Sequence, residues 1–358
     1  MDITPEVPPL VAYARMMRER GGDKAAFAPT PADDRTKNPM RPRSLAGVIG
    51  QEKAKALARA AIDRAKATGR PMDHMLLVAQ SGTGKSTFSH VIANELGVDV
   101  YDVEAPISFD TLLSLRTVMQ DGDVLKIEEI HQQGIGDRRG RAAATQPEVL
   151  YAVMEDRVLP TETGVLPFPA ITVIGTTTDE GLLPDAFVNR FALKPRLVPY
   201  TEDDLILMAA RNAHVLGLKI RRNAARIFAR ACRAVPREMN NLVKNAAIWA
   251  TTDTIGRSEA ERVLEVNGIA HDGLTPDMQA MLTFMLTRCE RVVRGEVRYQ
   301  ASVNAIATAI GKSRDSKAIA LRVEPFLIER GLVQVASGGR VLTPAGELRA
   351  AEIEGSKS

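Results

Sequence analysis

The sequence predicts an α/β protein in which a nucleotide-binding sheet is followed by a helical domain and a winged helix. Three observations predict this order: a glycine-rich phosphate-binding motif, apolar runs of strand length that alternate with helical patterns, and helices followed by a hairpin near the C-terminus. With 358 residues, the chain is long enough for two or three domains.

The glycine-rich motif lies between an apolar run, Met75 to Val78, and a helical stretch, Phe88 to Leu96. Its glycines allow backbone N–H groups to surround phosphate oxygens, a lysine can reach the terminal phosphates, and a hydroxyl can bind Mg²⁺. The motif therefore predicts a site for a nucleoside triphosphate with Mg²⁺. Its residues are Gly82, Thr83, Gly84, Lys85, Ser86 and Thr87.

The composition is that of a globular protein, with 45% hydrophobic and 25% charged residues. A net charge of +3 and a pI near 8.8 are compatible with nucleic-acid contacts but do not require them. Cys232 and Cys289 are the only cysteines, which excludes a disulfide framework and a cysteine-rich zinc site. The N-terminus lacks a signal-peptide pattern and no stretch is apolar enough to span a bilayer, so we expect a cytoplasmic protein with no membrane association.

Four regions follow from the pattern along the chain. Residues 1–40 mix proline, glycine and charges and predict a flexible arm, with one short helix at 10–18. Residues 41–198 predict the nucleotide-binding core, in which the apolar runs 75–78, 98–103, 124–127 and 171–175 form a parallel sheet.

The two C-terminal regions have a different pattern. Residues 199–271 are read as helices only, which predicts a small helical lid. Residues 272–358 contain helical patterns and then two short apolar runs around the turn Ser337 to Arg340. That order predicts a winged helix.

Two strands of the predicted core end in polar side chains. Glu128 and Glu129 follow the run 124–127, an arrangement in which the first carboxylate supports Mg²⁺ and the second polarises a water nucleophile. Thr177 follows the run 171–175, where its hydroxyl is predicted to contact the γ-phosphate or the attacking water. All three side chains are expected at one edge of the sheet.

Short segments distributed along the chain resemble those of the RuvB family. The resemblance extends from about Arg41 to about Leu348 in the family order and includes residues 41–45, 49–53, 92–98, 122–125, 130–131, 154–156, 181–183, 189–191, 236–237 and 324–328. It implies an AAA+ core with a helical lid and a C-terminal winged helix. It also implies an ATP-hydrolysing DNA translocase that drives Holliday junction branch migration as a homo-oligomer, expected to be a hexameric ring.

The resemblance assigns roles to single residues. Lys85 and Ser86 match the Walker A positions, Glu128 and Glu129 the Walker B pair, and Thr177 sensor 1. The family match makes Arg190 the arginine finger, which stabilises the transition state at a neighbouring subunit, and Arg237 sensor 2. Val48 and Ile49 are expected to contact the purine.

Basic residues in the predicted winged helix are candidate contacts to double-stranded or junction DNA. Non-specific contacts to phosphates are the role we predict for them, and merely solvated charges are the alternative. These residues are Lys312, Arg314, Lys317 and Arg340.

Three positions near the nucleotide site depart from the family pattern. Ala79 replaces the first P-loop glycine, and Glu128 replaces an aspartate, which displaces the carboxylate by one methylene group. Lys126 lies in the middle of a strand expected to be buried, on the same face as Glu128. A buried lysine needs a partner, so we expect it to pair with Glu128 or another group and to slow hydrolysis.

Two further regions differ in length from the family pattern. A glycine-rich basic stretch, Gly134 to Arg141, is additional and is either a DNA-facing element or a solvated loop. The segment between Asp156 and Pro169 is shorter than the hairpin with which RuvB proteins engage RuvA. This shortening argues against a RuvA-like partner.

Two other functions remain open from the sequence. The chain is alternatively a slowly hydrolysing, ATP-dependent loader or switch that acts on a DNA-bound partner protein, a reading that Lys126 and Glu128 favour. A third possibility is a catalytically silent subunit of a mixed ring.

Overall fold

The computed structural model describes residues 39–134, 147–161, 164–293, 296–311, 319 and 323–356. The predicted arm with its helix at 10–18, most of the basic stretch after Gly134, and Lys312, Arg314 and Lys317 lie outside the described residues. The chain forms two compact units, one ending at Tyr200 and the other beginning at Thr201, and each is described by itself.

The first unit contains a parallel sheet of four strands in the order β1-β6-β3-β2. Beyond β1, Leu193 and Arg196 form single parallel bridges to it, so that β1 is flanked on both sides. Strands β1, β3 and β6 are almost wholly buried, as expected for a parallel sheet covered on both faces, whereas the edge strand β2 is buried only at its first two residues. They are β1 (Met75–Val78), β2 (Val100–Glu104), β3 (Val124–Glu128) and β6 (Thr172–Thr177).

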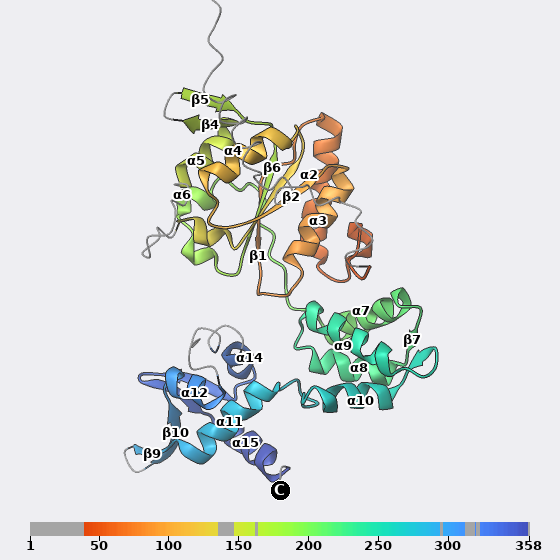
Figure 1. Ribbon diagram of the computed structural model, residues 1–358, viewed down its shortest axis with the longest axis vertical. Helices are drawn as coiled ribbons and strands as arrows, with labels where there is room; N and C mark the ends of the chain where they lie inside the picture. Colours follow the sequence, from red (N-terminus) through yellow and green to blue (C-terminus); the bar gives the residue numbers. More distant parts are fainter. Residues whose placement is uncertain are drawn as a thin grey trace, which may run out of the picture. The chain divides into compact units, whose positions relative to one another are not determined.

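Helices cover both faces of this sheet (Figure 1). One hydrophobic cluster lies beneath α2 and α3, and a second lies beneath α4, α5 and α6. The bounds are α2 (Glu52–Thr68), α3 (Lys85–Leu96), α4 (Phe109–Val118), α5 (Pro147–Glu155) and α6 (Asp185–Val188). Smaller elements are the 3-10 turns η2 (Leu45–Gly47), η3 (Ile130–Gly134) and η4 (Glu180–Leu182), and the hairpin β4 (Val158–Thr161) and β5 (Gly164–Pro167).

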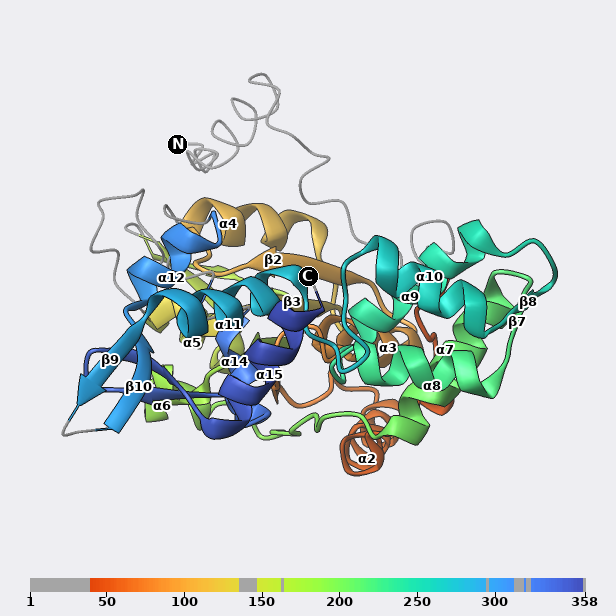
Figure 2. The same ribbon diagram turned by 90° about the horizontal axis from the view of Figure 1, so that it is seen from below.

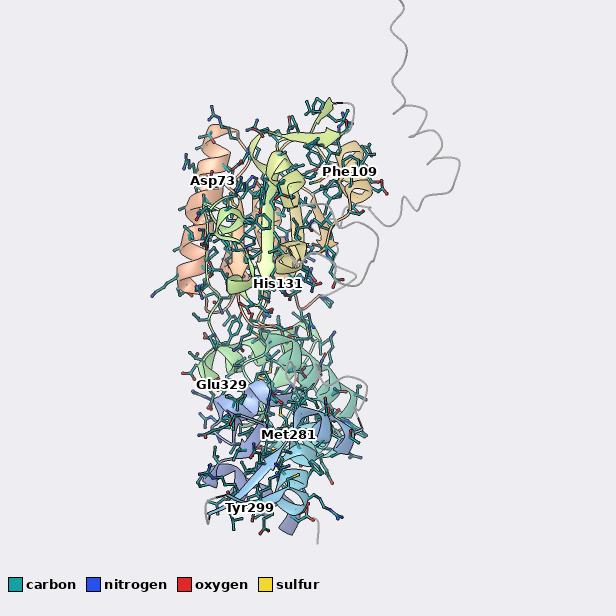
Figure 3. All side chains as sticks on the ribbon, turned by 90° about the vertical axis from the view of Figure 1, so that its left-hand side faces the viewer. Asp73, Phe109, His131, Met281, Tyr299 and Glu329 are labelled. Atoms are coloured by element: carbon teal, nitrogen blue, oxygen red, sulfur yellow. The ribbon has the colours of Figure 1, made fainter. Side chains whose placement is uncertain are left out.

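The four strands predicted from apolar runs are all present, with ends that differ from the prediction by up to two residues. The carboxyl ends of parallel strands meet at one edge of a sheet, which is where ligands bind in such folds. His131 lies toward this edge, whereas Asp73, which precedes β1, lies toward the opposite edge (Figure 3).

The second unit begins with four packed helices, α7 (Glu202–Val215), α8 (Arg222–Ala231), α9 (Pro236–Trp249) and α10 (Arg257–Val266). Thr201 caps α7 through a reciprocal pair of hydrogen bonds with Asp204. The prediction of helices only was wrong in one respect, because β7 (Lys219–Ile220) and β8 (Thr254–Ile255) form a short parallel pair. Two residues are too few to produce a recognisable strand pattern.

The remainder of the second unit has winged-helix organisation. Its four-stranded antiparallel sheet has the order β11-β12-β10-β9, and α11 packs against α15 (Figure 2). The predicted hairpin is present as β11 (Val333–Ala336) and β12 (Gly339–Leu342), whereas β9 (Glu290–Val293) and β10 (Glu296–Ala301) were not predicted. The helices are α11 (Pro276–Arg288), α12 (Val303–Ala309), α14 (Glu324–Glu329) and α15 (Pro344–Gly355).

Gly339 shows why the hairpin needs glycine. Its φ is 145°, and a Cβ atom at this position would lie 2.1 Å from the carbonyl oxygen of Ala301 on the neighbouring strand. Only glycine permits this close approach.

Among the described residues, no helix has both the length and the apolar character needed to cross a membrane.

Candidate nucleotide site

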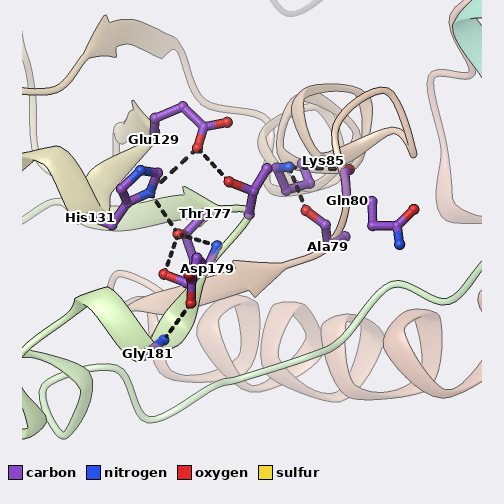
Figure 4. A network of polar contacts seen from close by, with 9 residues as sticks. Ala79, Gln80, Lys85, Glu129, His131, Thr177, Asp179 and Gly181 are labelled. Atoms are coloured by element: carbon purple, nitrogen blue, oxygen red, sulfur yellow. Dashed lines mark hydrogen bonds and ion pairs between the residues drawn. The ribbon is translucent and has the colours of Figure 1, made fainter. Parts of the chain in front are cut away.

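The glycine-rich loop connects β1 to α3 at the carboxyl edge of the sheet. Gly82 and Gly84 have φ angles of 80° and 105°, the left-handed conformation that glycine adopts without strain. Lys85 is buried, and its Nζ donates to the carbonyl oxygens of Ala79 (2.7 Å) and Gln80 (3.3 Å) (Figure 4). Replacing the usual first glycine by Ala79 therefore leaves the loop folded around its lysine.

Ser86 and Glu128 meet at this edge, as the sequence predicted for a pair of Mg²⁺ ligands. The Ser86 hydroxyl donates to Glu128 Oε1 over 2.6 Å. The same Oε1 atom lies 2.7 Å from the Nζ atom of Lys126. One carboxylate oxygen thus receives both a hydroxyl and an ammonium group.

Lys126 has a second acidic partner that the sequence did not identify. The parallel register places Asp102 of β2 beside Lys126 of β3, and their side chains pair at 3.0 Å. The other Asp102 oxygen lies 2.9 Å from Nε2 of the buried His90 on α3. We call these five residues, Ser86, His90, Asp102, Lys126 and Glu128, the ionic cluster.

Charges within the ionic cluster hold its two carboxylates ionised. Burial alone would raise the pKa of Glu128, but hydrogen bonds from Lys126 and Ser86 outweigh it, so the pKa lies below its usual value. Burial likewise opposes ionisation of Asp102, and the contacts with His90 and Lys126 lower its pKa despite that. Lys126 therefore has two acidic partners, the expected Glu128 and also Asp102.

The arrangement of Ser86 and Glu128 suits a Mg²⁺ ion. A serine that donates its proton to a carboxylate keeps its lone pairs for a metal, and Mg²⁺ in phosphate sites takes one or two protein ligands together with phosphate oxygens and waters. No group of three or more His, Cys, Asp or Glu side chains suited to a metal occurs in the described part of the chain. A nucleotide would have to complete the coordination.

Glu129 occupies a different environment immediately after β3. Its φ of 47° is a left-handed backbone conformation that is unfavourable for a residue with a side chain and concentrates at functional sites. The hydroxyl of Thr178 donates to Glu129 Oε2 (3.2 Å), and His131 Nδ1 lies 3.4 Å from the same oxygen (Figure 4). We call Glu129, His131, Thr177 and Thr178 the hydroxyl cluster.

The end of β6 differs from the sequence prediction. Thr177, which we predicted to face the γ-phosphate, is fully buried, and its hydroxyl bonds with His131 Nδ1 (2.9 Å) and with the backbone of Asp179. Thr178 is exposed and reaches Glu129 instead. The threonine hydroxyl that bonds to Glu129 therefore belongs to the following residue.

The segment expected to contact the purine is fixed on both sides. Val48 is buried, and its carbonyl oxygen accepts from Lys55 Nζ over 3.0 Å. The side chain of Gln51 exchanges two hydrogen bonds with the backbone of Val198, of 2.7 and 2.9 Å. Ile49, between them, is partly exposed.

Arg190 lies just beyond α6 and packs against α5. Its guanidinium stacks over the ring of Tyr151, 3.9 Å from the centroid, and its Nε atom lies 3.1 Å from Glu155. The carbonyl oxygen of Ala186 accepts a further hydrogen bond from it. The predicted arginine finger thus has partners on its own subunit.

The remaining predicted residues lie in the second unit. Arg237 is exposed in the first turn of α9. Arg340 does not project into solvent as a phosphate contact requires, because it pairs at 2.7 Å with the almost fully buried Glu324 of α14. Of the four candidate DNA contacts, Arg340 is the one that lies in the described part of the chain, and its visible role is to join the hairpin to a helix.

Comparison with known proteins gives a consistent result. Residues 40–197 match the family described as the Holliday junction DNA helicase RuvB P-loop domain. The Holliday junction branch migration complex subunit RuvB of Rubrobacter xylanophilus is 32% identical over 91% of this chain and 89% of the relative. The corresponding subunit of Kosmotoga olearia is 32% identical over 85% and 87%.

Solved structures agree with these sequence matches. A point mutant of Thermotoga maritima RuvB superposes with a TM-score of 0.73 at 27% identity, covering 87% of this chain and 98% of the other. The structure described as the Thermotoga maritima RuvB Holliday junction branch migration motor gives a TM-score of 0.71 with the same coverage. With its AAA+ core, helical lid and winged helix, and with this similarity along most of its length, the chain belongs to the RuvB family.

Proposed function

We propose that this protein hydrolyses ATP in a ring of identical subunits, expected to be hexameric, and uses the energy to translocate DNA and drive branch migration of Holliday junctions. The observation that carries the proposal is the convergence of Lys85, Ser86, Glu128 and Glu129 at one sheet edge in a chain that resembles branch migration subunits over most of its length. Two free cysteines favour the reducing cytoplasm as its location.

The chemistry follows from the two carboxylates. Glu129 would orient a water molecule and accept its proton as the water oxygen bonds to the γ-phosphorus and the bond to the β-phosphate oxygen breaks, releasing ADP and phosphate. Lys85 would leave its loop carbonyls and bind the terminal phosphates. Ser86 and Glu128 would hold Mg²⁺, which would supply positive charge to stabilise the phosphates.

Arg190 would complete the site of a neighbouring subunit. Added positive charge at the transferred phosphoryl group stabilises the transition state, and an arginine supplied by a neighbour contributes about 10³ to 10⁵ in rate. To reach the neighbour, Arg190 must give up its contacts with Tyr151 and Glu155. We propose that ring assembly drives this exchange.

The second unit would contact DNA. We propose that its basic residues Lys312, Arg314 and Lys317 grip phosphates without base preference, while Arg340 braces the hairpin through Glu324. The β4–β5 hairpin has only four residues in each strand, and we propose that a RuvA-like partner does not use it.

A subunit-mixing experiment tests the proposed site. The variants Lys85→Ala and Arg190→Ala are each expected to lose ATP turnover, by at least about 10³-fold for Arg190→Ala. A mixture of the two should regain turnover, because an intact arginine then faces an intact P-loop in some interfaces. A mixture as inactive as its components would show that Arg190 does not act between subunits.

Arg64→Ala is the matched control, because Arg64 is an exposed arginine of the same unit that pairs with Asp73 at 3.7 Å. It should leave turnover unchanged. Turnover and branch migration are then measured with no DNA, with linear duplex and with a four-way junction. An absence of ATP binding, or a protein that stays monomeric with ATP, Mg²⁺ and DNA, would overturn the proposal.

The ionic cluster favours a second candidate, an ATP-dependent switch that loads or remodels a DNA-bound protein. Pairing of Lys126 with Glu128 at 2.7 Å partly neutralises a predicted metal ligand, which is expected to slow hydrolysis more than binding. Assembly on DNA with ATP but almost no turnover would support the switch. Turnover stimulated by DNA together with branch migration would support the motor.

A further inference from the structure

The ionic cluster contains a buried cation at a place where the fold does not need one. Lys126 lies in the middle of β3, and its side chain is 2% exposed. Its strand neighbours Leu125 and Ile127 are apolar and fully buried. A buried ion pair stabilises a fold little better than well-packed apolar side chains, so the packing of the sheet does not explain this lysine.

The position of the ammonium group relates it to the nucleotide. Lys126 Nζ and the hydroxyl of Ser86 contact the same atom, Glu128 Oε1, at 2.7 and 2.6 Å. The positive charge therefore contacts one predicted Mg²⁺ ligand, Glu128, directly and is separated from the other, Ser86, by a single oxygen atom. Asp102 on the neighbouring strand pairs with the same ammonium group at 3.0 Å, and His90 contacts the other oxygen of Asp102.

Two electrostatic consequences follow. A fixed positive charge beside Glu128 opposes the approach of a divalent cation to the same carboxylate. It also cancels the negative charge with which Glu128 would repel the triphosphate when no divalent cation is bound. Both effects reduce the contribution of Mg²⁺ to nucleotide binding.

We propose that Lys126 acts as a built-in cation of the nucleotide site, so that this protein binds a nucleoside triphosphate with much less dependence on divalent metal than a site with an apolar residue at position 126. The proposal rests on the proposed binding of ATP. It concerns how strongly the binding of Mg²⁺ and the binding of nucleotide depend on each other. It assigns no catalytic role to Lys126.

The test measures this coupling by equilibrium binding. The affinity for a fluorescent methylanthraniloyl-ATP is measured in EDTA and in Mg²⁺. The affinity in Mg²⁺ divided by the affinity in EDTA, called the affinity ratio, is then compared between variants. Mn²⁺ binding in the presence of ATP, followed by electron paramagnetic resonance, gives a second readout that is independent of hydrolysis. Lys126→Met should increase the affinity ratio by about tenfold or more and tighten Mn²⁺ binding to a similar extent.

Two variants serve as controls for charge and for general effects of mutation. Lys126→Arg keeps the charge and should retain the wild-type ratio. Lys219→Met removes an exposed lysine that pairs with Asp253 at 2.9 Å in the second unit, and it should also leave the ratio unchanged. If Lys126→Met fails to fold, the double variant Lys126→Met with Asp102→Asn removes the unpaired carboxylate as well and should show the same increase.

The outcomes separate this inference from the function on which it rests. An affinity ratio that does not change when Lys126 loses its charge overturns the inference alone. Failure of the wild-type protein to bind ATP both in EDTA and in Mg²⁺ overturns the proposed function and the inference together. A ratio that rises equally in Lys219→Met would also overturn the assignment to Lys126.

Discussion

Glu128 and Glu129 are consecutive residues, yet they belong to two clusters of opposite character. Glu128 lies in the ionic cluster, where it contacts a buried ammonium group, and Glu129 lies in the hydroxyl cluster, where it contacts a threonine and a histidine. The first environment fixes a charge, whereas the second consists of hydrogen bonds that can rearrange as a reaction proceeds. The comparison teaches that this chain carries an additional fixed charge at the proposed metal site and an adjustable carboxylate at the proposed site of water activation.

The largest effect that tests this contrast is expected at Glu129. Glu129→Gln removes the proposed proton acceptor, so single-turnover hydrolysis should fall by about 10² to 10⁴-fold while ATP affinity changes little. Glu128→Gln should instead weaken Mn²⁺ binding and lower turnover less. If Glu128→Gln had the larger effect on hydrolysis at saturating Mg²⁺, the division of labour between the two carboxylates would be wrong.

A smaller effect, on stability, is expected in the ionic cluster. Lys126→Ala leaves two carboxylates without their shared cation and should lower the free energy of unfolding of the first unit by about 2 kcal/mol. We expect less than for a fully buried pair because Asp102 and Glu128 keep 34% and 44% of their side-chain surface exposed. Urea unfolding with nucleotide absent measures this loss, and Lys219→Ala is the control with no expected change.

The smallest effect should come from the two threonines of the hydroxyl cluster. Thr178→Val deletes one exposed hydrogen bond to Glu129, worth about 1 kcal/mol, and should reduce turnover about fivefold without changing stability. Thr177→Val is the matched change at a buried hydroxyl and should lower stability by a similar energy. Equal loss of turnover with no stability change in both variants would contradict the different roles of these neighbours.

Contiguous patterns explain how much of the fold was predictable. The P-loop was recognisable because its residues, its preceding strand and its following helix are consecutive, and the winged-helix hairpin because two apolar runs flank a glycine turn. The β7–β8 pair was missed because its strands are two residues long. The β9–β10 hairpin was missed although residues 296–301 of β10 alternate polar and apolar side chains, a strand signal that we overlooked.

The site was predictable only where neighbours in space are neighbours in sequence. Glu128 and Glu129 follow directly from the end of a strand, but the contact of Lys126 with Asp102 depends on the register between β2 and β3, which no local pattern determines. The contact of Thr178 with Glu129 was not anticipated for a related reason, because one residue of uncertainty at a strand end exchanges the two faces. Arg340 turned inward because Glu324 is buried and needs a countercharge.

The resting position of Arg190 on Tyr151 and Glu155 has a consequence for how activity scales with protein concentration. Under the proposed function, a diluted protomer has a satisfied guanidinium and an incomplete active site, so it is stable but idle. Hydrolysis should then rise more steeply than in proportion to the amount of protein, and solitary copies would not consume the cell's ATP.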